Sequence, residues 1–229
     1  MSEENKQQKQ EIISTRTFSV PSNLKKVQEN ITITSLSKEQ IINQAFEFHL
    51  KGNILEALKY YEYFLNKGFS DYRVLTNYAT ILKSIGKLKE AEISQRKALK
   101  LKPDHAESYA NLGAILKDLG KLKDAENSTR KAIELKPNYA NAYSNLGTIL
   151  KGLGKLKDAE ISTRKAIKLK PDYAEAHSNL GTILKGLGKL KDAEISIRKA
   201  IKINPNLAGL YSNLGNILKD LGNLEEAKK

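Results

Sequence analysis

A period of 34 residues constrains this chain more than any other feature of its sequence. Residues 147–162 are identical to residues 181–196, one period later. The same interval separates successive prolines, which are Pro103, Pro137, Pro171 and Pro205. A fixed period of about 20 to 50 residues indicates a repeat array, in which each unit packs on its neighbours instead of around one central core.

Each repeat has the pattern of two helices joined by a short turn. In the repeat at residues 140–173, Tyr143, Leu146 and Leu150 recur at spacings of three and four residues, which predicts one apolar helix face. Gly154 favours a left-handed stop for this first helix, and the same spacing restarts at Leu156. The unit is therefore predicted to be a helix hairpin.

The boundaries between helices carry their own signals. Pro171 is expected to end the second helix, and Asp172, with Glu175 three residues later, is expected to cap the next helix. The small residues Gly147 and Ala159 face each other in this pattern and are predicted to let the two helices approach closely.

The order Tyr143, Leu146-Gly147, Ala159 and Pro171 resembles the tetratricopeptide repeat (TPR) pattern. The resemblance covers roughly residues 38–229 and extends to bacterial TPR proteins and to the TPR region of O-linked N-acetylglucosamine transferases. It implies an all-α fold, a right-handed superhelical α-solenoid of stacked antiparallel helix hairpins.

The chain is predicted to consist of a mostly disordered polar lead at residues 1–37 and a TPR array at residues 38–229. Apolar residues of the lead, around Phe18, are expected to pack on the first repeat, where an aromatic run at residues 60–64 closes the N-terminal end. Ser37 and Gln40 have capping-box spacing at the start of this repeat. The repeats are a divergent one at 38–71, regular ones at 72–105, 106–139, 140–173 and 174–207, and a truncated one at 208–229.

The truncated repeat stops within its second helix and leaves an apolar face from Leu214 to Leu224 uncovered. The isolated chain is therefore expected to fray from about residue 208 onward or to associate end to end with a second copy. Either the chain is a piece of a longer protein, or a partner covers this end.

Composition narrows the function classes. A net charge of +13 favours anionic partners, and the absence of cysteine excludes disulfides and thiol chemistry. The start of the chain has no apolar signal segment, so a cytoplasmic protein that does not enter membranes is expected. The histidines His49, His105 and His177 have no ligand spacing, no catalytic motif is present, and we predict no metal, no cofactor and no enzymatic activity.

Two rows of polar residues are the candidate binding site. Positions 2, 5, 6, 9, 12 and 13 of each first helix are expected on one side, opposite the apolar face, and in TPR proteins that side lines a concave groove. Position 6 carries asparagine in every repeat, which resembles the asparagine ladder of O-linked N-acetylglucosamine transferases; the residues are Asn43, Asn77, Asn111, Asn145, Asn179 and Asn213. An amide both donates and accepts hydrogen bonds, so the row suits the backbone of an extended peptide, although these amides could instead bond to a neighbouring repeat.

The second row lies about 120° round the helix at position 12 and carries Lys83, Lys117, Lys151, Lys185 and Lys219. It favours an acidic or C-terminal carboxylate ligand, and the alternative is a solvated lysine row. Arginines such as Arg164 follow a glutamate by four residues on the second helix, which indicates surface ion pairs on a solvated face.

Three functions follow in order of preference. The first is a non-enzymatic scaffold that binds an extended peptide or protein segment in the concave groove. The alternative is the TPR targeting region of a larger transferase. Nucleic-acid binding ranks last, because tyrosines such as Tyr109 and Tyr143 are predicted on the core face and not among the basic residues.

Overall fold

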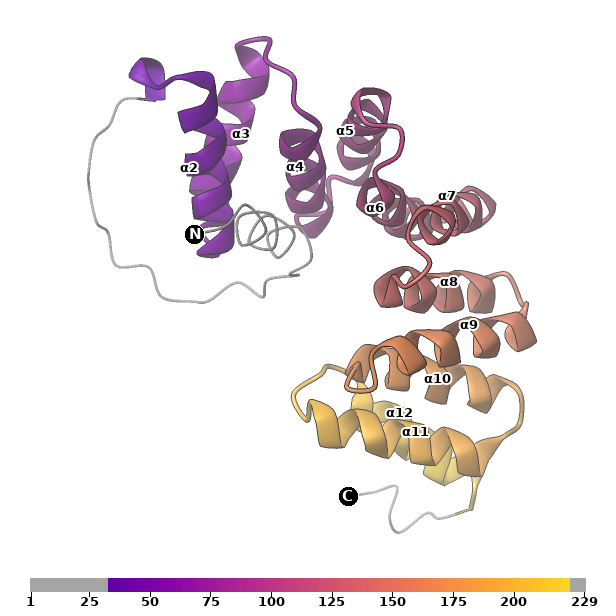
Figure 1. Cartoon of the computed structure of the whole chain (residues 1–229). Helices are drawn as coiled ribbons and strands as arrows, with labels where there is room; N and C mark the ends of the chain where they lie inside the picture. The colour runs from indigo at the N-terminus through magenta and orange to yellow at the C-terminus, as the bar shows by residue number, and fades with distance from the viewer. Residues whose placement is uncertain (1–32, 223–229) are drawn as a thin grey trace, which may run out of the picture. The chain divides into compact units, whose positions relative to one another are not determined.

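The computed structural model describes residues 33–222, in which a short 3-10 turn, η1 (Ile33–Ser35), precedes eleven α-helices and no strand occurs (Figure 1). The all-α fold of antiparallel helix hairpins predicted from the sequence is confirmed. The helices are α2 (Lys38–Leu50), α3 (Ile54–Asn66), α4 (Tyr72–Ser84), α5 (Leu88–Leu101), α6 (Ala106–Asp118), α7 (Leu122–Leu135), α8 (Ala140–Gly152), α9 (Leu156–Leu169), α10 (Ala174–Gly186), α11 (Leu190–Ile203) and α12 (Leu210–Asp220).

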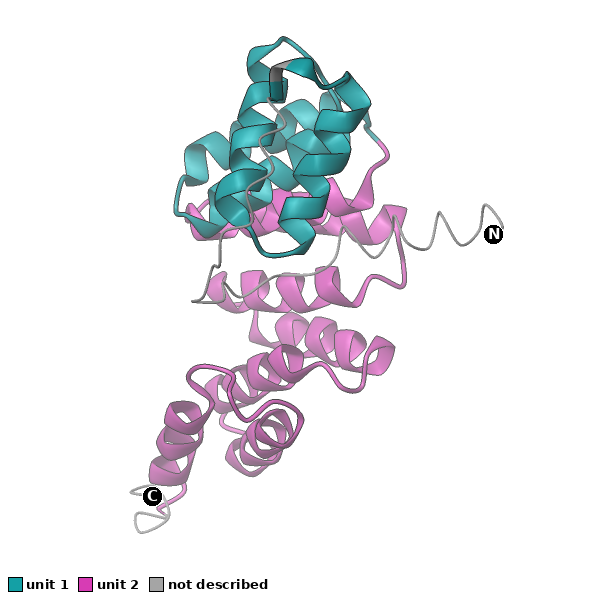
Figure 2. Cartoon of the chain, turned by 90° about the vertical axis from the view of Figure 1, so that its left-hand side faces the viewer, with its two compact units in different colours: residues 1–103 teal, residues 104–229 magenta. Residues whose placement is uncertain are grey.

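The chain divides into two compact units, residues 1–103 and residues 104–229 (Figure 2). Unit 1 contains the hairpins α2–α3 and α4–α5, and unit 2 contains the hairpins α6–α7, α8–α9 and α10–α11 together with α12.

The turn inside each hairpin depends on one glycine. Gly154 adopts a φ of 75° two residues after α8 ends, and its N–H bonds to the Lys151 carbonyl oxygen. This left-handed conformation, which a residue with a side chain rarely adopts, confirms the predicted helix stop. The glycines one or more periods away, such as Gly120 and Gly188, have nearly the same φ.

One predicted cap is wrong. The residue that precedes α10 is Tyr173, which makes no side-chain cap hydrogen bond, and Asp172 lies in the turn before it. The chain leaves α9 through a bond from the Tyr173 N–H to the Lys170 carbonyl oxygen, which moves the helix start one residue beyond the aspartate. By contrast, the capping box of Ser37 and Gln40 is present at the start of α2.

The two helices of a hairpin pack closely because small residues face each other. A Cβ atom added at Gly147 would overlap the Thr163 hydroxyl and lie 3.3 Å from the Ala159 carbonyl oxygen. Ala159 is fully buried. The predicted close approach between Gly147 and Ala159 is therefore confirmed.

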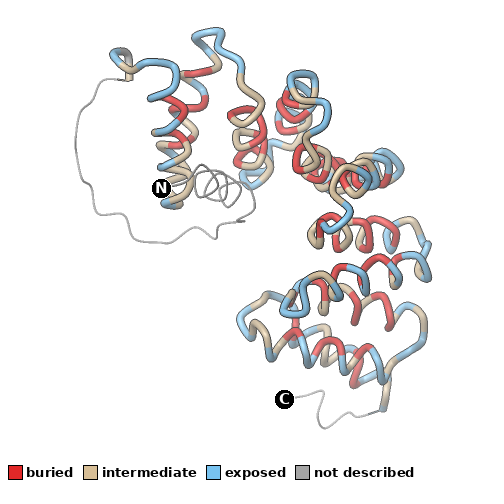
Figure 3. The backbone as a smooth tube through the Cα atoms, in the orientation of Figure 1, coloured by how far each residue is buried: buried red, intermediate tan, exposed pale blue. Residues whose placement is uncertain are grey.

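The core continues from one hairpin to the next, so the repeats bury apolar faces that a single hairpin would leave in water. In unit 2, Ile183 of α10 belongs to the same cluster as Leu146 and Leu150 of α8, and Ile217 of α12 packs with Leu184 of α10. Buried and exposed positions accordingly alternate along each helix (Figure 3).

In unit 1 the aromatic run of α3 forms the centre of the core. Tyr61 and Phe64 are fully buried, and Ile33 and Leu36 pack against this cluster from the N-terminal side. The expected contact between the run and residues around Phe18 falls outside the described residues, as does the expectation for Leu224.

Candidate functional site

The first helices of the unit 2 repeats form one layer. Successive members of the series α6, α8, α10 and α12 approach each other directly, so equivalent positions on them form continuous rows. Asn111, Asn145, Asn179 and Asn213 lie on these four helices and are all half-buried. Asn43 and Asn77 lie on α2 and α4 of unit 1.

The asparagines of the row do not have equal surroundings. The Asn179 amide donates a hydrogen bond to the Ser144 hydroxyl of the preceding repeat at 3.3 Å, and Asn77 lies near the buried Tyr61 hydroxyl, where it opposes the rise in the pKa of Tyr61 that burial causes. Within the described part of the chain, the Asn111, Asn145 and Asn213 side chains make no hydrogen bond. Bonding to a neighbouring repeat therefore occupies some members of the row and leaves others able to bond to a ligand.

The lysines of the row have different partners, and two of them contact the following repeat. The Lys151 ammonium donates to the Thr182 hydroxyl at 3.2 Å, and the Lys185 ammonium lies 3.1 Å from an Asp220 carboxylate oxygen. Lys117 pairs with its neighbour Asp118 at 3.2 Å. The charge of Lys151, which faces a neutral hydroxyl, is therefore less compensated than those of Lys117 and Lys185.

Position 5 was expected to face the groove with the two rows, and this expectation is wrong for the first two repeats of unit 2. Ala110 and Ser144 are buried, at 2% and 3% exposure. Ser144 lies under the next repeat, where its hydroxyl accepts a hydrogen bond from the Asn179 amide. Neighbouring first helices stand so close that this position becomes part of the junction between them.

The second helices carry the predicted ion pairs within each repeat. Four arginines lie about one helical turn after a glutamate and contact it at 2.8 to 2.9 Å, in the pairs Glu92–Arg96, Glu126–Arg130, Glu160–Arg164 and Glu194–Arg198. Pairing at this spacing confirms the predicted ion pairs. The arginines are about half exposed, but the glutamate side chains are only 12 to 23% exposed, so the expectation of a fully solvated face is wrong for the glutamates.

An additional bond between repeats was missed from the sequence. Lys155 contacts Glu126 at 2.9 Å, and Lys189 contacts Glu160 at 2.8 Å. These two glutamates therefore also form an ion pair with the lysine at the turn of the following hairpin. Hydrogen bonds from the lysine and from Arg164 hold the pKa of Glu160 below its usual value, with the lysine as the larger cause. The constant spacing of 29 residues between this glutamate and lysine is the signal that could have indicated the pair.

Residues 33–222 contain no group of three or more His, Asp or Glu side chains that could hold a metal ion. None of the helices in that range is both long enough and apolar enough to cross a bilayer.

Family models described as the tetratricopeptide repeat match residues 72–105, 106–139, 129–161, 174–207 and 197–229. The chain belongs to the tetratricopeptide repeat family. The TPR hairpins seen here also account for the close packing at Gly147 and for the glycine at each turn. No curated protein sequence matches the chain.

Solved TPR structures share this fold. The chain is 25% identical to MamA over 72% of its length and 96% of the MamA chain, with a TM-score of 0.60. It is 26% identical to YrrB, described as a TPR protein with an unusual peptide-binding site, over 69% of this chain and 81% of YrrB, with a TM-score of 0.54. A TPR protein from Parabacteroides merdae is 23% identical over 83% of this chain and 76% of its own, with a TM-score of 0.67, and shows the fold alone.

Proposed function

We propose that this chain is a protein-interaction scaffold whose unit 2 binds an extended peptide along the first helices of its TPR hairpins. The TPR family and fold support an interaction scaffold, and YrrB, a structural relative, is described as having a peptide-binding site. The proposal carries no catalytic step, since the groups at this site supply hydrogen bonds and charge.

The observation that carries the proposal is the state of the Asn111 and Asn145 amides. Both are half-buried on adjacent first helices, and neither has a hydrogen-bond partner within residues 33–222. Partly buried polar groups normally find partners, and an amide can pair with both the N–H and the C=O of an extended backbone. Two such amides one repeat apart would hold a peptide without reading its side chains.

Lys151 adds a preference for an acidic side chain or a terminal carboxylate at one place along the row. Lys151 is exposed, and its ammonium donates to the Thr182 hydroxyl without a carboxylate partner among residues 33–222, whereas the Lys185 charge is compensated by Asp220. A carboxylate beside Lys151 would gain a charge-assisted hydrogen bond, which is about twice as strong as a neutral one.

The asparagines are tested with the full chain and a peptide selected for binding from a displayed random library. Changing Asn111 and Asn145 together to Ala should weaken binding by about tenfold or more, because each lost hydrogen bond is worth about 1 kcal/mol. Asn127→Ala is the matched control, since Asn127 is an exposed asparagine of the second-helix face, on α7. Unchanged affinity in the double variant would contradict the proposal.

The lysine preference has its own comparison. Lys151→Ala should weaken an acidic peptide more than Lys185→Ala does, and the difference should shrink as salt is added. Equal losses for the two variants would show that the lysine row acts as a uniform charge and not through Lys151.

A further inference from the structure

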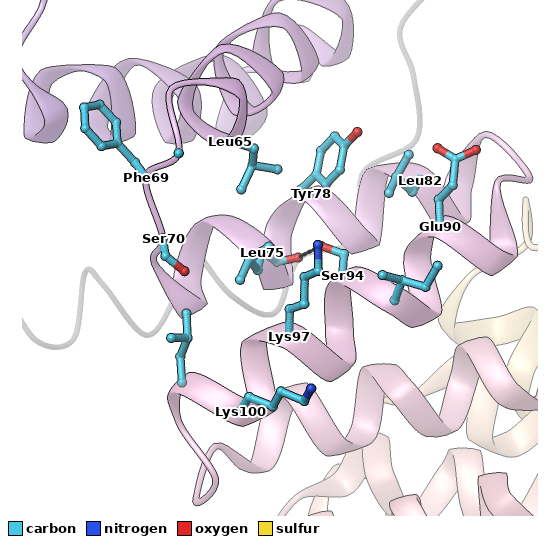
Figure 4. A pocket seen from close by; sticks show the side chains of 13 residues that line it. Leu65, Phe69, Ser70, Leu75, Tyr78, Leu82, Glu90, Ser94, Lys97 and Lys100 are labelled. Carbon is cyan, nitrogen blue, oxygen red and sulfur yellow. Dashed lines mark hydrogen bonds between the residues drawn. The ribbon is translucent and has the colours of Figure 1, made fainter.

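A hollow of about 540 Å³ opens in unit 1 (Figure 4). It lies between the end of α3 and the pair α4–α5. Its lining is mainly apolar and comes from all three helices, with Leu65 of α3, Leu75, Tyr78 and Leu82 of α4, and Ile93 and Leu101 of α5.

The divergent first repeat explains why this space is open. α3 has 13 residues against 14 in α5, and Gly68, with a φ of 76°, turns the chain where the regular repeats have a lysine before their proline. Phe69, in place of that proline, has its ring 5.3 Å from the ring of Phe64 in α3, so it is held on the α3 side of the hollow. Helix α3 consequently packs less closely on α4 than α7 packs on α8.

Apolar surface is left in water at the mouth of the hollow. Ile93 is 57% exposed and Leu101 is 50% exposed, and both lie on α5 facing this space. Exposed apolar residues gathered beside a hollow, instead of scattered singly, mark an interaction surface. The volume is in the range of a few hundred Å³ that holds a ligand or one or two large side chains.

The charge around the hollow is positive. The lining contains Lys97 and Lys100 but only one carboxylate, Glu90, and Lys38 lies 5.8 Å from the centre of the Phe69 ring at the opposite rim. Neither Lys97 nor Lys100 forms an ion pair with any residue that the structure describes. A ligand that places a carboxylate here would be attracted by charges that the protein itself does not compensate.

We propose that this hollow of unit 1 binds a peptide segment of a partner protein in which a large aliphatic or aromatic side chain stands next to Asp or Glu. The apolar side chain enters between Leu75, Tyr78 and Ile93, and the carboxylate meets Lys97 and Lys100. This second site is lined by α3, α4 and α5, whereas the function proposed above uses Asn111 and Asn145 of α6 and α8, so the chain would engage a partner through two different sets of helices.

The test uses the full chain and three fluorescent peptides of about twelve residues, measured by anisotropy. The first alternates Leu and Glu, the second alternates Leu and Lys, and the third alternates Ser and Glu. The Leu/Glu peptide should bind at least about ten times more tightly than either of the others, because it alone offers both apolar contact and carboxylates.

Variants locate the binding to the hollow, and the repeat supplies their controls. Ile93→Glu should weaken the Leu/Glu peptide by about tenfold or more, as should the double change of Lys97 and Lys100 to Glu. The matched controls lie at the same repeat positions in unit 2, where Ile161→Glu and the double change of Lys165 and Lys168 to Glu should leave the affinity within about twofold. Unchanged helical circular dichroism confirms that each variant is folded.

Four results would overturn the proposal: no binding of the Leu/Glu peptide, equal binding of the Leu/Lys peptide, equal losses in the matched controls, or loss on changing Asn111 and Asn145 but not Ile93. The last result would place the peptide in the unit 2 row and support only the function proposed above. A further variant, in which Phe18 and Val20 of the full chain are both changed to Ser, tests a different occupant of the hollow. Tighter peptide binding in that variant would show that the chain's own N-terminal segment occupies the hollow, which also overturns an external partner as its occupant.

Discussion

Replacing Gly147 with Ala should destabilise the α8–α9 hairpin, although the same change in an ordinary helix stabilises it. Alanine in place of a glycine inside an exposed helix gains about 1 kcal/mol. Here the new methyl group would overlap the Thr163 hydroxyl and crowd the Ala159 carbonyl oxygen at 3.3 Å. The gain in helix propensity is therefore opposed by the packing between the two helices.

The cost follows from what Thr163 must give up. Its hydroxyl is fully buried and donates to the Ala159 carbonyl oxygen at 2.8 Å. Turning the side chain away breaks this bond and leaves a buried polar group without a partner, which costs about 1 to 3 kcal/mol. After subtraction of the propensity gain of about 1 kcal/mol, Gly147→Ala should lower the free energy of unfolding by up to about 2 kcal/mol.

A double-mutant cycle separates the overlap from other effects. Thr163→Ala removes the hydroxyl that the new methyl group would meet, so the double variant should recover most of the loss and show a coupling of about 1 to 2 kcal/mol. Gly181→Ala is the comparison in α10, where the added Cβ would lie 2.6 Å from both Cγ1 and Cδ1 of the buried Ile197 and 3.1 Å from the Ala193 carbonyl oxygen. No side-chain hydrogen bond is at stake there, so changing Ile197 to Ala should relieve the overlap without leaving a polar group unpaired.

Urea denaturation followed by circular dichroism gives the free energies, and hydrogen exchange shows whether the loss is confined to α8 and α9. The reasoning would be refuted if Gly147→Ala stabilised the chain by about 1 kcal/mol, as an unopposed helix glycine does, or if the cycle gave no coupling.

Three further predictions concern stability. Lys189→Ala should lower the free energy of unfolding by about 0.5 to 1 kcal/mol at low salt, because it removes the ion pair with Glu160. Since the pKa of Glu160 is lowered in the folded chain, this loss should be complete at neutral pH and should disappear as acid protonates Glu160, which urea titrations at several pH values would measure. Ser37→Ala should cost about 1 kcal/mol and speed hydrogen exchange in the first turn of α2, whereas unchanged exchange would count against the cap. His49 bonds to the Tyr61 hydroxyl, and burial lowers its pKa to about 4. Unit 1 should therefore lose stability as pH falls from about 6.5 toward 4, because the unfolded chain binds the proton more readily than the folded one. His49→Gln should remove this pH dependence, and a dependence that persisted in the variant would contradict its assignment to His49.

The features that the sequence predicted correctly are local. The spacing of Leu146 and Leu150, the left-handed turn at Gly154 and the pair of Glu160 with Arg164 all depend on residues within one repeat. Helix geometry alone relates such residues, so their placement needs no knowledge of how hairpins stack.

The features that it missed lie between repeats. The burial of Ser144 and the contact of Lys189 with Glu160 depend on the rotation and distance from one hairpin to the next. The hollow beside Ile93 depends on the same geometry, altered by the short α3 and by Gly68. Periodicity predicts that repeats stack but does not give the angle between them, so these contacts could not be placed from the pattern.

The duplicated segments 147–162 and 181–196 show how an identical sequence acquires different chemistry in such an array. Lys151 and Lys185 occupy the same place in the two copies, yet the partner of each is supplied by the repeat that follows it. Lys151 meets the neutral Thr182 hydroxyl, whereas Lys185 meets the Asp220 carboxylate, which stands where the preceding repeat has Gly186. The lysine row is therefore uniform in sequence, but its lysines differ in how far their charge is compensated. The residue that faces each lysine from the next hairpin decides where an anionic group would bind most strongly.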